Sequence, residues 1–163
     1  MYEKVLSSLK TRDDVEAVEE EIKKISKSLY EGDVNSIQNV LKKDIRNFFS
    51  EIVRQETNIN DIKSVENYLR ILEEKLKAIF DVTIIVAFEP SGYAISKFYD
   101  LVQQNIKEKI VLDIEFDPHI IGGAIIIYKG KYKDYSLKTV FNDELNKTQG
   151  EILNMLNIQK AKN

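Results

Sequence analysis

His119 is the only histidine in this chain of 163 residues, and the chain has no cysteine. A metal centre would therefore lack its usual nitrogen and sulfur ligands. A serine–histidine pair would need a serine brought close by the fold, and no serine carries the glycines of a nucleophile elbow. We interpret His119 as an ordinary turn residue, and we expect neither a metal nor a cofactor.

Two carboxylates, Asp113 and Glu115, lie two residues apart in the alternating stretch 110–116. A strand with this period would place both on one face, where they could act as a paired acid and base. No pocket-forming motif accompanies them, and most of the 27 carboxylates lie on polar helix faces. We expect no catalytic residues. Among the classes of function considered, an enzyme therefore ranks third.

Gly122 and Gly123 are the glycine pair most open to a ligand-binding interpretation. They lack the spacing of a phosphate-binding loop and precede a strand, whereas such a loop precedes a helix. They also lack the Gly-x-x-Gly loop of RNA-binding KH domains. We expect the pair to serve backbone geometry between a strand that ends at Asp117-Pro118 and the next strand, 124–128.

The stretch 128–133, Tyr-Lys-Gly-Lys-Tyr-Lys, interleaves aromatic and basic residues in an expected hairpin. Single-stranded RNA is often bound by surfaces of this composition. Lysines also protect the exposed edge of a hairpin, and a net charge of −3 gives no general attraction to nucleic acid. We favour edge protection and expect no nucleic acid partner. A small RNA-binding module of the translation machinery is the alternative.

The composition is that of a globular chain, with 43% apolar and 31% charged residues. The absence of cysteine fits a cytosolic protein. No apolar run approaches the roughly 20 residues that span a bilayer. We therefore expect no direct insertion into a membrane.

Helical periodicity dominates the first half of the chain. Apolar residues recur every three or four positions over 11–30, 33–55 and 62–79, which predicts three long amphipathic helices with room for a short one before them. Gly32 is a natural helix stop and Asp33 a natural cap. Short links between such helices favour an antiparallel bundle.

The pattern changes after Asp81. Residues 82–88 are apolar on both faces and β-branched, as in a central strand, and a helix is expected from Gly92 to about residue 109. Three strands follow, over 110–116, 124–128 and 131–135.

A final helix begins after Ser136, and Gly150 should weaken or break it. The sequence thus predicts an α+β fold. Residues 1–81 form an antiparallel helical bundle, and residues 82–163 form a small α/β domain with a roughly four-stranded mixed sheet and flanking helices.

The apolar stripes of the helices are expected to bury mainly against one another. The stripe of the helix over 33–55 is wide, however, and the final helix continues apolar beyond Gly150. An exposed remainder on either helix would suit a partner helix. On the final helix the candidate partner contacts are Leu137, Phe141 and Leu145.

The run Asp117-Pro118-His119-Ile120-Ile121-Gly122-Gly123 is followed by a hairpin and by Asp134-Tyr135-Ser136-Leu137-Lys138. This order resembles the C-terminal signature of the F-type ATP synthase delta subunit family, whose mitochondrial relative is the oligomycin-sensitivity-conferring protein. The resemblance covers roughly residues 82–145. It marks five positions as the structural motif: Asp117, Pro118, Gly122, Gly123 and Ser136.

The resemblance implies a non-catalytic subunit of the peripheral stalk, or stator, of a proton-translocating F-type ATP synthase. In that family the N-terminal domain grips the N-termini of the alpha subunits, and the C-terminal domain holds the end of the membrane-anchored b subunits. The head then cannot turn with the rotor. The implied location is cytoplasmic, at the cell membrane only through the complex.

The family's N-terminal domain is a six-helix bundle. The pattern before residue 82 predicts fewer helices, so we expect a shortened N-terminal domain.

Overall fold

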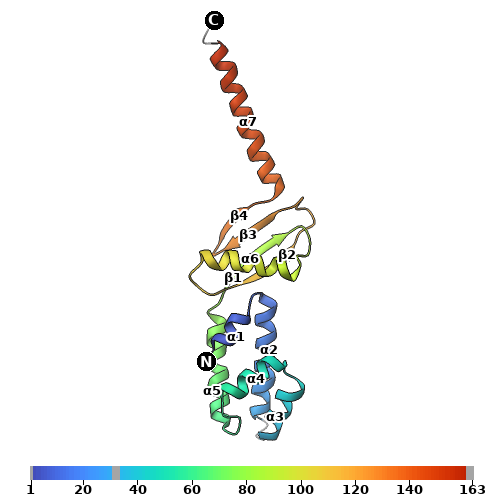
Figure 1. The fold of residues 1–163 in the computed structure, drawn as a ribbon, viewed down its shortest axis with the longest axis vertical. Helices are drawn as coiled ribbons and strands as arrows, with labels where there is room; N and C mark the ends of the chain where they lie inside the picture. The colour runs from blue at the N-terminus through green and yellow to red at the C-terminus, as the bar shows by residue number, and fades with distance from the viewer. Residues whose placement is uncertain (1, 31–33, 161–163) are drawn as a thin grey trace. The chain divides into compact units, whose positions relative to one another are not determined.

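The computed structural model describes residues 2–30 and 34–160; of the side chains of Val34 and residues 152–160 nothing is described. The predicted helix stop and cap at Gly32 and Asp33 lie outside the described residues. In the described chain five helices precede the first strand (Figure 1), which are α1 (Glu3–Ser8), α2 (Arg12–Tyr30), α3 (Val34–Lys43), α4 (Asn47–Glu56) and α5 (Ile62–Lys77). The prediction of three long helices and a short one was therefore wrong in number.

The error lies in the helix predicted over 33–55, because the structure has two helices there, α3 and α4. The chain bends at Arg46, whose backbone has φ −58° and ψ 137°. Its amide donates to the Glu21 carboxylate of α2 at 2.7 Å and makes no helical bond. The Arg46 guanidinium binds the same carboxylate, at 2.9 Å and 2.8 Å. A buried acid on a neighbouring helix thus ends α3 and starts α4.

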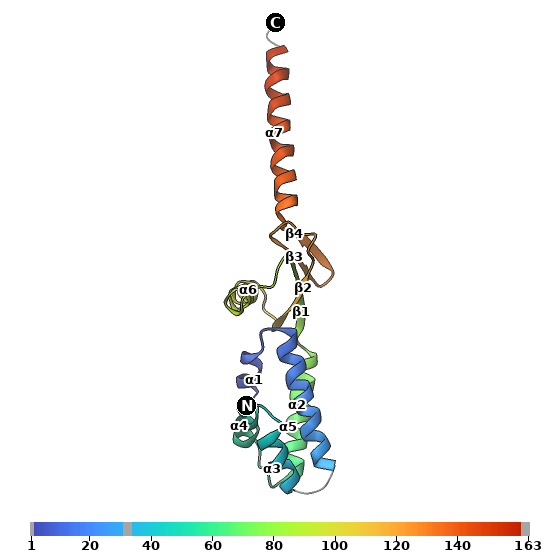
Figure 2. The same ribbon diagram turned by 90° about the vertical axis from the view of Figure 1, so that its right-hand side faces the viewer.

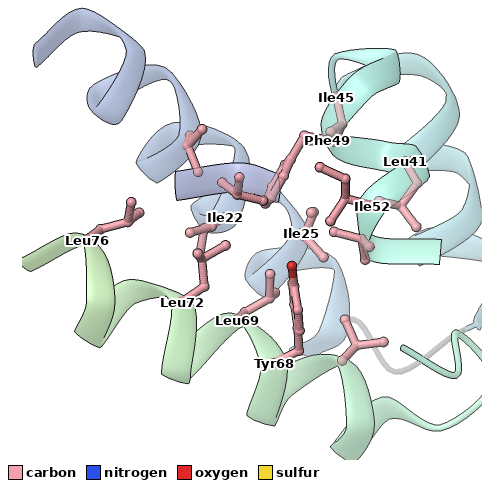
Figure 3. Close-up of a cluster of buried hydrophobic side chains, with 14 of the residues drawn as sticks. Ile22, Ile25, Leu41, Ile45, Phe49, Ile52, Tyr68, Leu69, Leu72 and Leu76 are labelled. Atoms are coloured by element: carbon pink, nitrogen blue, oxygen red, sulfur yellow. The ribbon is translucent and has the colours of Figure 1, made fainter. Parts of the chain in front are cut away.

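Side chains from α2, α3, α4 and α5 form the main core (Figure 3). Phe49 of α4 points toward Ile22 of α2, and Tyr68 and Leu72 of α5 lie on the opposite side of the cluster. Each of these side chains is almost completely buried. Burial of each large apolar side chain contributes roughly 1.5–3 kcal/mol, so this cluster supplies most of the driving force for the helical part.

Four strands form one mixed sheet in the order β2-β1-β3-β4, with bounds β1 (Phe80–Val86), β2 (Ile110–Phe116), β3 (Ala124–Tyr128) and β4 (Lys131–Asp134). The β1 and β2 strands run in the same direction, because Phe80 N donates to Lys109 O at their starts and Asp117 N donates to Val86 O at their ends. Such a parallel pair needs a crossover, which contains helix α6 (Gly92–Asn105).

The other two strands form the predicted hairpin. β3 is antiparallel to both β1 and β4. Lys129 and Gly130 join β3 to β4 with φ of 47° and 73°, the positive values that tight hairpin turns require. The α+β fold with a four-stranded mixed sheet is thereby confirmed. β1 differs in one respect, because Thr83 and Ile85 are only half-buried between the buried Val82, Ile84 and Val86.

The chain forms two compact units. One consists of Met1–Asp81 with Tyr93–Asp113, and the other of Val82–Gly92 with Ile114–Asn163. We call the first of these the helical unit. Helix α6 from Tyr93 onward and the first half of β2 belong to it. The division into domains 1–81 and 82–163 stays a prediction.

The last helix, α7 (Leu137–Lys160), follows β4 (Figure 2) and belongs to the second unit. It continues through Gly150, so the predicted break there was wrong. A single glycine costs a helix only about 1 kcal/mol, which the helix can absorb.

Candidate partner-binding surface at the last helix

The loop over 117–123 connects β2 to β3 and meets the start of α7. Asp117 N donates to Val86 O at 3.0 Å, which fixes the loop to the end of β1. At its other end Gly122 O accepts from Leu137 N at 3.0 Å, and Ala124 O accepts from Tyr135 N at 2.9 Å. The loop and the segment 134–139 together form what we call the α7 socket.

Asp117 organises the first half of this loop. Its carboxylate accepts from His119 N at 2.9 Å and lies 2.9 Å from His119 Nδ1, while its carbonyl accepts from Ile120 N. Pro118 occupies the second position of this turn, where its fixed φ is favoured. The His119 amide, and then its imidazole, lower the pKa of Asp117. The His119 side chain is 92% exposed, as expected of a turn residue.

Gly122 and Gly123 allow α7 to begin close to the loop. Their φ values are 136° and 80°, a region that side chains rarely adopt. A Cβ on Gly123 would collide with the Tyr135 carbonyl oxygen and lie 3.0 Å from Ser136 Cα. A Cβ on Gly122 would meet only the flexible Leu137 side chain, at 2.9 Å. Gly123 is therefore the stricter requirement.

Asp134 and Thr139 complete the socket. The Asp134 carboxylate accepts from Ser136 N at 2.7 Å and from Thr139 Oγ1 at 2.8 Å. Buried Ser136 lies between them, and its hydroxyl accepts a long bond from Thr139 N at 3.4 Å. The motif residues marked by the resemblance include neither Asp134 nor Thr139. The spacing Asp-x-Ser-x-x-Thr before an apolar helix is the signal that points to them.

The hydrogen bond from the Ser136 amide is the main reason that the pKa of Asp134 lies below its usual value. The folded state thus favours the ionised carboxylate. This contribution is present above the ordinary aspartate pKa and is lost only as the pH falls through the lowered value. The start of α7 is accordingly held in place at neutral pH.

We expect Gly123→Val to destabilise the chain by roughly 1–3 kcal/mol, the cost of forcing a side chain into this backbone region. Because the new side chain would also clash with the Tyr135 carbonyl, we expect the destabilisation to lie at the upper end of this range. Urea unfolding measures the change. Gly130→Val is the matched control, since Gly130 also has positive φ but nothing within 4 Å of its Cβ position. Equal losses for the two variants would show that close approach to α7 is not the reason for Gly123.

The described side chains of α7 are exposed from Leu137 to Glu151, except Thr139 and Gly150. The apolar residues Leu137, Phe141 and Leu145 share this exposure, with Phe141 at 69%. The expectation that this stripe is buried in the chain's own core was therefore wrong over these residues. An isolated helix gains little stability in water, and a contiguous apolar stripe on an anchored helix is typical of a site for a partner.

The helical unit has apolar side chains at its surface as well. Tyr30 at the end of α2 and Phe48 of α4 are exposed. A surface hollow next to Tyr30 is lined by Leu29 and by Ile62 of α5. These residues offer a second, separate place for an amphipathic segment.

The residues considered for chemistry are Asp113, Glu115 and His119, and the structure gives their exposure. Asp113 is half-buried and Glu115 is exposed. Within residues 2–30 and 34–160, His, Cys, Asp and Glu side chains do not gather in groups that could hold a metal ion. No described helix is both long and apolar enough to cross a bilayer.

The hairpin lysines lie beside aromatic rings of their own hairpin. Lys129 Nζ is 5.2 Å from the Tyr128 ring centre, and Lys133 Nζ is 5.2 Å from that of Tyr135. The contact of Lys129 uses the face of Tyr128, one of the two tyrosines of the stretch 128–133, and the other, Tyr132, is exposed. The two cation–π contacts fit a solvated edge hairpin.

Replacement of Lys129, Lys131 and Lys133 by glutamine should therefore leave the unfolding midpoint and partner binding nearly unchanged. Surface substitutions of this kind usually change stability by less than about 0.5 kcal/mol. Fluorescence anisotropy with a labelled single-stranded RNA tests the alternative directly. Binding of the parent chain at physiological salt that is lost in the triple variant would support an RNA-binding role.

An anchored helix with an exposed apolar stripe is characteristic of a subunit in a larger protein assembly. The model of the family "ATP synthase delta (OSCP) subunit" matches residues 2–148, and the chain belongs to this family. Within it the chain is a stator subunit of ATP synthase, and its role is structural. The match includes the helical part, so the resemblance is not confined to residues 82–145.

Two relatives illustrate the similarity. The ATP synthase subunit delta of Desulforapulum autotrophicum is 29% identical over 136 residues, which is 78% of this chain and 73% of that protein. A chain in the cryo-EM structure of the Toxoplasma gondii mitochondrial ATP synthase hexamer is 15% identical, with a TM-score of 0.36. That alignment covers 86% of this chain and 84% of the other.

Proposed function

We propose that this chain connects the catalytic head of the ATP synthase to the b subunits of the stalk. Its helical unit binds the N-termini of the alpha subunits, and α7 with its socket binds the end of b. The chain has no catalytic residues of its own. It resides in the cytoplasm and reaches the membrane only through the complex.

The exposed stripe of Leu137, Phe141 and Leu145 is the observation that carries this proposal. These residues lie one turn apart along one side of α7. A partner helix laid along them would bury apolar area that the chain itself leaves in water. The socket holds the first turn of α7, so less conformational entropy is lost when the partner binds.

The alpha-subunit contact rests on the surface near Tyr30 and Ile62. An amphipathic segment placed in that hollow would cover the exposed Tyr30 ring. The two contacts lie on different compact units. One chain can therefore hold both partners at once, which is what a stator link requires.

The test is a titration of the full chain with a peptide from the C-terminus of the b subunit of the same organism, followed by calorimetry. We expect saturable 1:1 binding with a negative heat-capacity change, the mark of apolar burial. A scrambled peptide of equal composition is the control. No binding of the authentic peptide to the folded chain would remove the proposed contact with b.

A further inference from the structure

The link between α1 and α2, residues 9–11, lies along the edge of β2. Lys10 O accepts from Leu112 N at 2.8 Å, and Thr11 forms an isolated parallel bridge with Leu112. Leu9 beside them is buried in the helical core. We call residues 9–11 the strap. All of its contacts described here fall within the helical unit.

Lys109 holds the strap from the β2 side. Its ammonium donates to Leu9 O at 3.1 Å and to the Tyr99 hydroxyl at 2.6 Å. It also lies 4.9 Å from the centre of the Tyr99 ring, which is nearly buried. Lys10 of the strap in turn binds α6, because its ammonium donates to Ser96 Oγ at 3.2 Å.

Gln103 fixes the position of Lys109. Its Oε1 accepts from the Tyr99 hydroxyl at 3.2 Å and from Ile110 N at 3.3 Å. Its Nε2 donates to the carbonyl oxygens of Ile106 and Glu108, at 3.0 Å and 2.9 Å. One side chain thus uses all its polar groups to hold the turn between α6 and β2.

The strap matters because only Ala78 and Ile79 join α5 to β1. Two further contacts support this short link, because Val111 of β2 is buried in the helical core and Arg12 of α2 pairs with Asp81 of β1 at 3.6 Å. The starts of β1 and β2 are joined by the bond from Phe80 N to Lys109 O at 3.1 Å. A strap attached to β2 adds a hydrogen-bonded connection between the helices and the beginnings of both strands.

We propose that the strap is a mechanical tether, closed by Lys109 and Tyr99, that stops the starts of β1 and β2 from swivelling on the helices when the subunit is under load. The idea of load rests on the proposed stator function. The tether itself is a property of the isolated chain. Lys109, Tyr99 and Gln103 are positioning residues in this account.

Hydrogen exchange of the full chain tests the tether. In Lys109→Met the Leu112 amide, bonded to the strap, should exchange at least about tenfold faster, because strap opening becomes a low-energy local event. Lys107→Met is the matched control, since Lys107 is exposed on the same turn. Tyr99→Phe should act in the same direction, whereas Tyr93→Phe, on an exposed position of α6, should have no effect. Unchanged Leu112 exchange in both Lys109→Met and Tyr99→Phe would overturn the proposal.

A distance measurement gives the second readout. The chain has no cysteine, so spin labels can be placed at Lys23→Cys in α2 and Asp100→Cys in α6 without other substitutions. The distance distribution between them should broaden in Lys109→Met and stay narrow in Lys107→Met. Binding of the b-subunit peptide should be equal in both. If the parent chain does not bind the peptide, that result counts against the proposed function. If the distance distributions of Lys109→Met and Lys107→Met are equally wide, that result counts against the tether.

Discussion

Arg46→Met should lower the free energy of unfolding by about 2–4 kcal/mol, because it strands a buried carboxylate. The Glu21 side chain is only 6% exposed, and of its three hydrogen bonds from Arg46 only the one from the backbone amide would remain. The bond to Glu21 is also the main reason that the pKa of Arg46 is raised. The Arg46 side chain is 51% exposed, which argues for less than the full cost of breaking a buried pair. Urea unfolding of the two chains measures the difference.

Two further variants show whether burial of the charge is the cause. Glu21→Met with Arg46→Met removes both partners and should be more stable than Arg46→Met alone, since no charge remains buried. Arg70→Met removes a single bond at 2.7 Å to Glu74, in a pair whose side chains are both about 60% exposed. It should cost less than about 1 kcal/mol. Equal costs for Arg46→Met and Arg70→Met would contradict the account.

Phe141→Ala and Leu145→Ala should each weaken binding of the b-subunit peptide by about 30-fold. A large apolar anchor at the centre of an interface contributes roughly 2 kcal/mol or more when truncated, and 1.4 kcal/mol is a factor of ten. Both side chains are exposed in the free chain, so truncation removes no core contact. Calorimetric titration of the full-length variants gives the affinities.

Asn146→Ala is the control on the opposite side of α7 and should bind like the parent. Circular dichroism should show each variant as helical as the parent chain. If Phe141→Ala unfolds the chain, the residue belongs to its own core. If it binds as tightly as the parent, the partner does not use this stripe.

Local sequence patterns predicted a helix correctly where apolar residues recur at helical spacing and no tertiary contact interrupts the helix. The helices predicted over 11–30 and 62–79 are found as α2 and α5. The helix predicted over 33–55 failed because the acceptor for the Arg46 amide is Glu21, which lies 25 residues earlier in the chain. No local periodicity can reveal an acceptor at that distance.

At the candidate site, too, some features were predictable from the local sequence and others depend on the folded chain. Gly122 and Gly123 were expected to serve backbone geometry, and the structure gives both a positive φ. The group that approaches Gly123 is the carbonyl of Tyr135, which only the folded chain brings near. The stripe of α7 was visible as a pattern, but whether it was covered depended on the rest of the fold. Gln103, Tyr99 and Lys109 show no spacing that would have singled them out.

The central claim is that one chain holds two partners at the same time. Native mass spectrometry of the full chain mixed with the N-terminal peptide of the alpha subunit and the C-terminal peptide of the b subunit tests it most directly. We expect a complex that contains one copy of each, with both binary complexes also present at lower peptide concentrations. A mixture in which the two peptides bind only in exclusion of one another, or in which neither binds, would contradict a linking role.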